Sequence, residues 1–449
     1  MENIKALISY IKSDEYRKLA ALSWSMAWPM ILIMGFEFLI SLTDVFIAGK
    51  LGREYQAAVG FSMQIYFIFV VVANSLTTGI VATIARIFAS GDTRGVSDSV
   101  FTSVVSAAVA GVFFGVAGIV ITEPVVNIMN VPDEIKKIAI PLIRIYAVGL
   151  IFHYFLISSN GILRATKGVK KSLITMGIVC LMNVVLNFYF VFYTPISYYG
   201  IALSTVVSVF IGSTINFIHV KKFIKHTGDF IRSLLGILFK IGWPTGLQQI
   251  SWQVGGTVLF LILSALPENN VEIIAAFTNG GRIESAIFLP AIALNMANAV
   301  IVGNLMGEKK YDHAYRAGLI TMALGVVIIT AITLAIVLNA RFIATLVSPD
   351  EIVIRESVRY IRISMISEPF LAVALTLGGA LNGAGDTRGV MLIVVLSSWL
   401  IRIPLCFLLG IVLEIGAPGI WWSMNASIFA YAFFVFRRYN RRKWFEINW

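Results

Sequence analysis

The sequence has few of the residues that build metal centres, disulfide frameworks or redox sites. Its 449 residues include only two cysteines, Cys180 and Cys406, and four widely separated histidines. No zinc, haem or disulfide motif is present, so we expect no bound cofactor. A nucleophile–base pair and a phosphate-binding loop are also absent, which disfavours an enzyme.

Charge is scarce as well. Charged residues make up 13% and hydrophobic residues 58% of the chain, with a mean hydropathy of +0.86. Soluble domains carry roughly 25% charged residues, so the composition indicates an integral membrane protein. Residues 1–17 lack the pattern of a removable signal peptide. The net charge of +11 comes without a nucleic-acid-binding motif, so we expect no nucleic-acid partner and interpret the basic residues as topology signals.

What the sequence does have is a series of long hydrophobic runs. A helix that crosses the bilayer needs about 20 apolar residues. On this basis we predict an all-α membrane protein with about twelve transmembrane helices, near residues 19–49, 56–85, 97–121, 137–163, 173–193, 200–218, 234–266, 273–303, 315–339, 353–381, 389–413 and 418–436.

The chain repeats itself. Pro132-Asp133-Glu134-Ile135 returns in the second half as Pro349-Asp350-Glu351-Ile352, and Trp28-Pro29 returns at nearly the same offset as Trp243-Pro244. We therefore predict two pseudo-symmetric six-helix bundles: an N-lobe over 1–220, a cytoplasmic linker over 221–233 and a C-lobe over 234–449. Duplicated bundles of hydrophobic helices are typical of secondary transporters, whose sites lie near the bilayer midplane.

The basic residues predict the orientation. Of 35 Lys and Arg residues, 24 fall at the termini and in the even-numbered connections, 7 in the odd-numbered connections and 4 within spans. By the positive-inside rule both termini are cytoplasmic. The stretch Lys221-Lys222-Phe223-Ile224-Lys225-His226 is either an amphipathic linker at the lipid surface or a solvated connector.

Four carboxylates lie in the interior of the predicted spans, away from the span ends: Glu37, Asp44, Glu284 and Glu368. Each costs about 2.5 to 3.5 kcal/mol to insert, which indicates a functional role. Glu37 and Asp44 are seven residues apart, so they share one helix face about 10 Å apart along the axis. They either handle an ion or proton or pair with a buried arginine such as Arg144.

Amide and hydroxyl side chains on two further helices complete a candidate cation site. Asn183 and Asn187 share a face of the fifth predicted helix, and Thr205 lies on the sixth. Their oxygens, with the Asp44 carboxylate, suit a monovalent cation if the helices meet. Taken singly, such residues also serve as hydrogen-bonding contacts between helices.

The second half contains its own polar residues. Arg282 and Glu284 lie on the eighth predicted helix and Glu368 on the tenth, and Gln248, Gln249 and Gln253 lie on the seventh. These residues form either a polar packing network around Arg282 or contacts to a substrate. Glu368 is the best candidate in this half for a function linked to protonation.

Several segments together resemble one transporter family. In the first half they are Trp28-Pro29, residues 44–52 (DVFIAGKLG), residues 183–187 (NVVLN) and residues 200–205 (GIALST); in the second half they are Arg282-Ile283-Glu284, residues 303–307 (GNLMG) and residues 381–387 (LNGAGDT). The chain is thereby identified as similar to prokaryotic multidrug and toxic compound extrusion (MATE) transporters over nearly its whole length.

The resemblance implies a MATE fold and multidrug efflux. Its implied function is antiport across the cell membrane, exporting organic, cationic drugs or toxic compounds in exchange for Na⁺ or H⁺ by alternating access between two lobes of a monomer. Asp44, Asn183 and Thr205 match the cation site of the N-lobe. Asn187 departs from the pattern, because prokaryotic members commonly have Asp there, and we hypothesise that Glu37 supplies the missing carboxylate. The alternative is a flippase for lipid-linked oligosaccharide or polyprenyl substrates.

Overall fold

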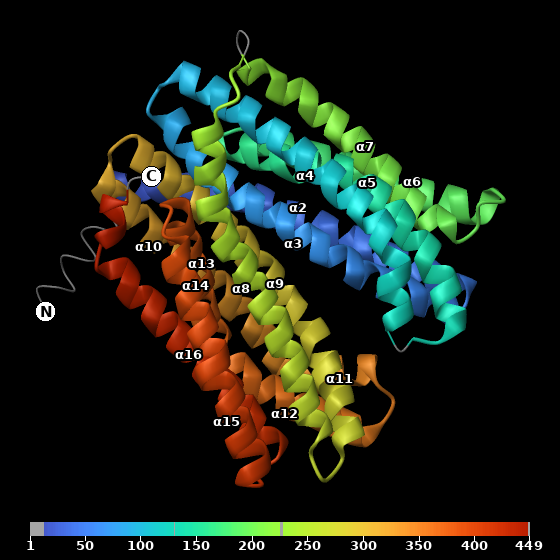
Figure 1. The fold of residues 1–449 in the computed structure, drawn as a ribbon. Helices are drawn as coiled ribbons and strands as arrows, with labels where there is room; N and C mark the ends of the chain where they lie inside the picture. Colours follow the sequence, from blue (N-terminus) through green and yellow to red (C-terminus); the bar gives the residue numbers. More distant parts are fainter. Residues whose placement is uncertain (1–12, 130, 225–227, 448–449) are drawn as a thin grey trace, which may run out of the picture. The chain divides into compact units, whose positions relative to one another are not determined.

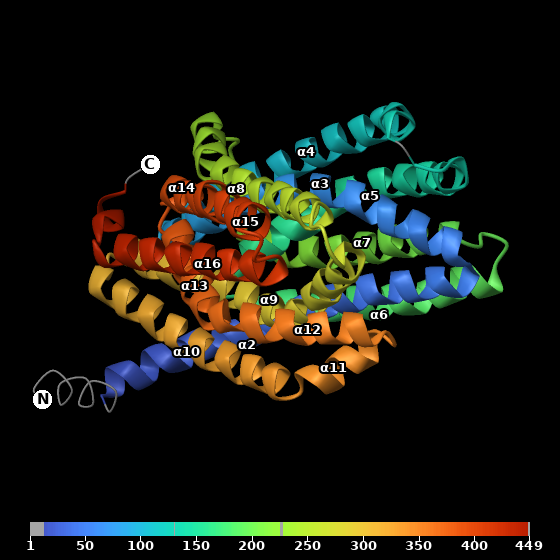
Figure 2. The same ribbon diagram turned by 90° about the horizontal axis from the view of Figure 1, so that it is seen from below.

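The computed structural model describes residues 13–129, 131–224 and 228–447. All regular structure in these ranges is helical (Figure 1, Figure 2). Lipid offers the backbone no hydrogen-bond partners, so a chain this apolar satisfies its peptide groups within helices. The all-α prediction is therefore confirmed.

The helices follow one another with short connections. In chain order they are α2 (Asp14–Leu51), α3 (Arg53–Ala89), α4 (Thr93–Ile128), α5 (Asp133–Ala165), α6 (Val169–Tyr193), α7 (Tyr199–Val220), η1 (Lys221–Phe223), α8 (Arg232–Ser264), α9 (Asn270–Gly307), α10 (Tyr311–Leu338), α11 (Ala340–Val347), α12 (Glu351–Ser364), η2 (Met365–Ser367), α13 (Glu368–Gly383), α14 (Thr387–Leu396), η3 (Ser397–Arg402), α15 (Ile403–Phe407), η4 (Leu408–Val412), α16 (Ala417–Asn440) and η5 (Lys443–Glu446). Segments η3 and η4 are π-helical.

The predicted spans agree with these helices. Among the described residues, eleven helical stretches are long and apolar enough to cross a membrane; two of them combine successive segments, Glu351–Gly383 and Thr387–Val412. Helix α8, with 33 residues, has the length of a further span. The protein is therefore a multi-pass membrane protein.

The repeated sequence marks equivalent helix starts. Pro132 is the N-cap residue of α5, and Asp350 is the N-cap residue of α12. The Asp350 carboxylate accepts hydrogen bonds from the backbone N–H groups of Ile352 and Val353 at 2.8 and 3.0 Å. These bonds satisfy donors that a helix leaves free at its first turn.

Two compact units make up the fold. The first unit is Leu32–Gly246, and the second unit comprises the chain up to Ile31 and from Leu247 onward. Helices α2 and α8 each contribute to both units, and both divisions fall two residues beyond the proline of the repeated Trp-Pro pair. The lobes 1–220 and 234–449 remain a prediction, and residues 225–227 of the predicted linker lie outside the described ranges.

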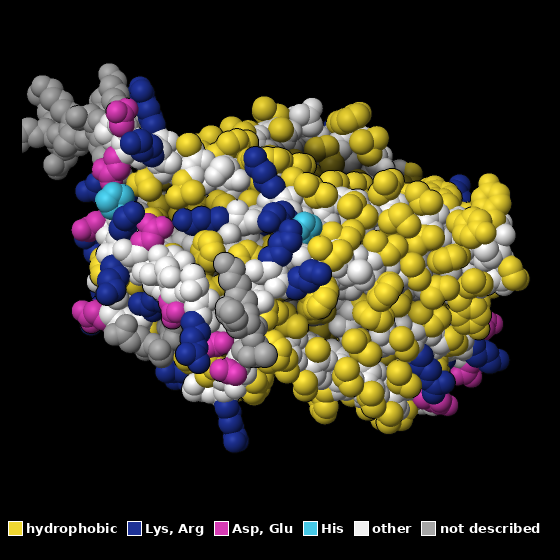
Figure 3. Space-filling view, turned by 90° about the horizontal axis from the view of Figure 1, so that it is seen from above, with side chains coloured by type: hydrophobic (Ala, Val, Ile, Leu, Met, Phe, Trp, Pro, Cys, Tyr) yellow, Lys and Arg dark blue, Asp and Glu magenta, His cyan; other side chains and the backbone are white. Residues whose placement is uncertain are grey.

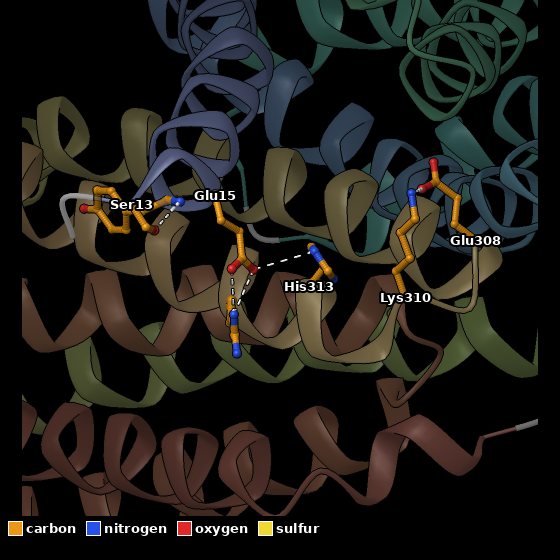
Figure 4. A network of polar contacts seen from close by, with 7 residues as sticks. Ser13, Glu15, Glu308, Lys310 and His313 are labelled. Carbon is orange, nitrogen blue, oxygen red and sulfur yellow. Dashed lines mark hydrogen bonds and ion pairs between the residues drawn. The ribbon is translucent and has the colours of Figure 1, made fainter. Parts of the chain in front are cut away.

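Polar contacts explain why the start of α2 belongs to the second unit. The Glu15 carboxylate accepts two hydrogen bonds of 2.8 Å from the Arg316 guanidinium on α10 and lies 3.6 Å from His313 Nε2 (Figure 4). Further along α2, Ser23 Oγ accepts a hydrogen bond of 2.8 Å from Thr321 Oγ1 on α10. The start of α8 is held in the first unit by Ser75 on α3, whose hydroxyl donates to the Gly242 carbonyl at 2.6 Å.

Small residues let helices approach closely in the first unit. A Cβ atom added to Gly111 on α4 would lie 2.9 Å from the Ile151 Cα on α5, and one on Gly115 would lie 3.0 Å from the Ala147 carbonyl oxygen. Close backbone packing at small residues is the usual way in which helices associate in membranes. Helix α5 is thereby fixed against α4 and presents its opposite face to the other helices of the unit.

An aromatic cluster lies in the core of the second unit. The rings of Phe277 and Trp421 stack with their centroids 5.8 Å apart, and Tyr360 meets Trp421 edge-on at 4.7 Å. Tyr360 and Trp421 are almost completely buried. These contacts hold the Tyr360 side chain in one position between α9, α12 and α16.

Hydrophobic side chains cover most of the face shown in Figure 3. The exposed hydrophobic side chains of α4 include Val109, Phe113, Val116 and Val120. Such contiguous exposed apolar surface indicates contact with a membrane. The surface of this helix is therefore expected to face lipid.

A half-buried ion pair gives a test of the second unit's stability. Arg438 on α16 donates two hydrogen bonds of 2.6 and 2.7 Å to the buried carboxylate of Asp386. Changing Arg438→Ala leaves that carboxylate without its partner and is expected to cost about 1.5 to 3 kcal/mol, the range for hydrogen bonds to charged groups, because Arg438 is itself partly exposed. The exposed pair of Arg341 and Glu351 is the control, since Arg341→Ala should cost about 0 to 1 kcal/mol. Thermal unfolding in detergent measures both, and equal losses would contradict the prediction.

Candidate functional site

Three helices of the first unit bring the predicted cation-site residues together. The Asp44 carboxylate on α2 accepts a hydrogen bond of 2.6 Å from the Asn187 amide on α6 and one of 3.4 Å from the Thr205 hydroxyl on α7. Thr205 in turn accepts a hydrogen bond of 3.1 Å from the Asn183 amide. Asp44 is 2% exposed, and both asparagines are completely buried. The condition that the helices must meet is therefore fulfilled.

Several oxygen atoms at this cluster lack a donor among the described residues. They are Asn183 Oδ1, Asn187 Oδ1 and the Tyr146 hydroxyl oxygen. The charge of Asp44 acts on the Tyr146 hydroxyl, which comes from α5. A buried acceptor without a partner costs about 1 to 3 kcal/mol. Amide and carboxylate oxygens are ligands for hard cations, so the cluster combines negative charge with free coordination capacity.

Beyond Tyr146 lies a polar extension that the sequence did not reveal. The Tyr66 ring packs 5.0 Å from the Tyr146 ring, and the Tyr66 hydroxyl is hydrogen-bonded to His153 Nδ1. Lone Tyr and His residues in spans carry no spacing signal, so only the packing of α3 against α5 identifies this pair. Through Tyr146 and Tyr66, the surroundings of Asp44 are thus connected to the imidazole of His153.

Glu37 is not part of the hydrogen-bonded cluster around Asp44. Its side chain is exposed, and its charge interacts with that of the buried Arg164 at the end of α5. No hydrogen bond joins it to Asp44 within the described part of the chain. Arg144, the arginine suggested as a partner for the span acids, instead donates to Glu123 at 2.7 Å. The role of Glu37 at the Asp44 site remains a hypothesis.

A second acidic cluster lies in the second unit. The Tyr360 hydroxyl on α12 donates to Glu284 Oε1 on α9 at 2.7 Å. Gly280, one turn before Glu284, makes room for this tyrosine, because a Cβ there would lie 2.2 Å from the Tyr360 ring. The glycine therefore determines how closely Tyr360 can approach the acid.

Arg402 is the cation of this cluster. Its charge interacts with both Glu284 and Glu368. The guanidinium lies 4.6 Å from the Trp252 ring centroid, and its Nε donates to Ser427 Oγ at 2.9 Å. Arg402 ends the π-helical segment η3, and π-helical turns often occur at functional sites. Glu368 is 2% exposed, and its Oε2 has no hydrogen-bond partner among the described residues.

Within the described ranges, no hydrogen bond joins the remaining predicted residues of the second half to this cluster. Arg282 is exposed, and no hydrogen bond from its guanidinium is found within the described ranges. Gln248 donates a long hydrogen bond of 3.4 Å to the Thr387 carbonyl. Gln249 is partly buried and Gln253 is exposed. The polar network of this half therefore surrounds Arg402 and not Arg282.

The MatE family model matches the chain twice, at residues 29–189 and 244–408. The two matches begin at Pro29 and Pro244, the two prolines of the repeated Trp-Pro pair. Each half of the chain therefore corresponds to one copy of the same membrane unit.

Known proteins match the chain along its length. It is 23% identical to an uncharacterized transporter, YisQ, of Bacillus subtilis over 442 residues, covering 94% of both chains. It is also 23% identical to a probable multidrug resistance protein, NorM, of Thermotoga maritima over 434 residues, covering 94% of this chain and 92% of that protein.

Solved structures share the fold. The chain superimposes on a multidrug resistance MATE family transporter in an outward-facing conformation with a TM-score of 0.90 at 19% identity, covering 96% of this chain and 97% of that one. A MOP superfamily transporter from Pyrococcus furiosus gives a TM-score of 0.89 at 20% identity with the same coverage. The lipid-linked flippase, the alternative suggested by the sequence, gains no support from these relatives. This chain belongs to the MatE family of multidrug and toxic compound extrusion proteins, and it is a transporter and not an enzyme.

Proposed function

We propose that the protein is a secondary antiporter that exports organic, cationic drugs or toxic compounds in exchange for Na⁺ or H⁺. It works as a monomer in the cell membrane, with both termini cytoplasmic, by alternating access between an N-lobe (1–220) and a C-lobe (234–449). The multidrug resistance protein of Thermotoga maritima supports the substrate class by similarity.

The Asp44 cluster is the observation that carries this proposal. A buried carboxylate, two buried amide oxygens without donors and a hydroxyl meet at one point of the first unit. Asp44, Asn183 and Thr205 would hold the coupling cation, with Asn187 as a further oxygen donor. Binding there drives transport only if it favours one arrangement of the lobes over the other.

The acids of the second unit supply a matching site for an organic cation. Glu284 and Glu368 carry two potential negative charges against the one positive charge of Arg402, and Trp252 offers an aromatic face nearby. Aromatic faces and carboxylates together attract organic cations. We propose Glu368 as the principal contact because one of its buried oxygens is without a partner.

Drug accumulation in bacteria that lack their own exporters tests this function. Cells that produce the protein should accumulate less ethidium than cells with an empty vector. Accumulation unchanged at verified membrane expression would contradict drug export.

The hypothesis about Glu37 has its own test. If Glu37 provides the carboxylate that Asn187 lacks, Glu37→Gln should abolish gradient-driven efflux from proteoliposomes while the protein still inserts. Glu134→Gln, an exposed change at the start of α5, is the matched control and should transport normally. Normal coupling in Glu37→Gln would reject this role.

A further inference from the structure

A cavity of about 490 Å³ lies at the end of the last span, in the second unit. Helix α14, the last turns of α16 and segment η5 surround it. The residues that matter for its chemistry are Ile393, Phe434, Arg437, Arg438, Arg441 and Lys443. The acids assigned to transport, Asp44, Glu284 and Glu368, are not among its lining residues.

The cavity is strongly positive. Asp386 is its single acidic lining residue among those described, and both of its oxygens already accept hydrogen bonds from Arg438. Arg437, Arg441 and Lys443 are exposed and make no ion pair within the described ranges. Three positive charges therefore remain for an anion.

Its walls combine this charge with apolar surface. Ile393 and Phe434 line the cavity, and Phe434 is 44% exposed on the membrane-spanning part of α16. The basic residues follow immediately, where the span ends. The wall beside η5 is held in place, since Trp444 is buried, stacks on Tyr439 at 5.0 Å and donates from Nε1 to its carbonyl at 2.9 Å.

We propose that this cavity binds the phosphate headgroup of an anionic phospholipid from the membrane around it. Positive charge alone would suit any phosphate, but the adjoining exposed apolar wall matches the glycerol and acyl region of a lipid. Basic pockets between transmembrane helices on the cytoplasmic side are suited to acidic headgroups. The lipid would fasten the C-terminal segment to the bilayer surface.

Native mass spectrometry of the full chain in detergent tests the assignment. The purified protein is titrated with phosphatidylglycerol, phosphatidylcholine or inorganic phosphate. Each basic residue near an anionic surface strengthens binding about five-fold, so Arg441→Gln with Lys443→Gln should weaken phosphatidylglycerol binding about 25-fold. Arg438 is left intact because it pairs with Asp386.

The matched control is Lys170→Gln with Lys171→Gln, two exposed basic residues at the start of α6 that do not line this cavity. This variant should bind the lipid as the unchanged protein does. Phosphatidylglycerol binding that is equal in both double variants, or matched by phosphatidylcholine, would overturn the proposal. If millimolar inorganic phosphate displaced bound phosphatidylglycerol from the protein, the cavity would be assigned to a free anion instead. If the Arg441/Lys443 variant is unfolded, Arg441→Gln alone is tested instead. This single variant should bind phosphatidylglycerol about five-fold more weakly than the unchanged protein, and equal binding would overturn the proposal.

Discussion

Asp44→Asn is expected to abolish gradient-driven efflux, with a loss of at least about 100-fold in rate. The amide keeps the shape of the carboxylate and can still accept a hydrogen bond from Asn187, but it removes the one full negative charge of the cluster. A buried cation without a counter-charge costs several kcal/mol, and a loss of about 1.4 kcal/mol is already a tenfold change. Efflux from proteoliposomes under an imposed gradient measures the loss.

Asp133→Asn is the control for this change. Its side chain is 88% exposed at the start of α5 in the same unit, so the same substitution there should leave efflux unchanged. Equal efflux by both variants would show that Asp44 takes no part in coupling.

Gly383→Val should strongly destabilise the second unit. A Cβ at Gly383 on α13 would lie 2.0 Å from the Ala299 carbonyl oxygen on α9, and one at Gly379 would lie 2.1 Å from that of Asn295. The obstacle is backbone, which cannot rotate away as a side chain can. We expect a loss of about 3 kcal/mol or more.

The open surroundings of Gly256 on α8 provide a matched comparison. No atom lies within 4 Å of a Cβ built there, so Gly256→Val should lower the thermal midpoint far less than Gly383→Val. Similar midpoints for the two variants would contradict the close approach of α9 and α13.

Much of the fold could be predicted because lipid permits few solutions. Long apolar runs must become helices, and the recurrence of Pro132-Asp133-Glu134-Ile135 indicates the repeat whose two copies start α5 and α12. In the site, Asn183 and Asn187 share a face because they are four residues apart. Asp44 lies far earlier in the chain, and its position next to these two asparagines was predictable only from the family resemblance.

What could not be predicted depends on contacts between distant segments. The sequence predicts either a polar packing network around Arg282 or substrate contacts in the second half, and it does not single out Arg402. Arg282 and Glu284 are two residues apart and point to different helix faces, whereas Arg402 approaches from the segment η3. The position of Tyr360 depends in the same way on Gly280 and on the stacked rings of Phe277 and Trp421.

Efflux of a fluorescent organic cation from proteoliposomes, with a Na⁺ gradient and a pH gradient imposed separately, tests the central claim most directly. Coupled antiport predicts concentrative efflux that saturates with substrate and is driven by one of the two gradients. Efflux that neither gradient drives, from protein shown to be folded and inserted, would contradict it.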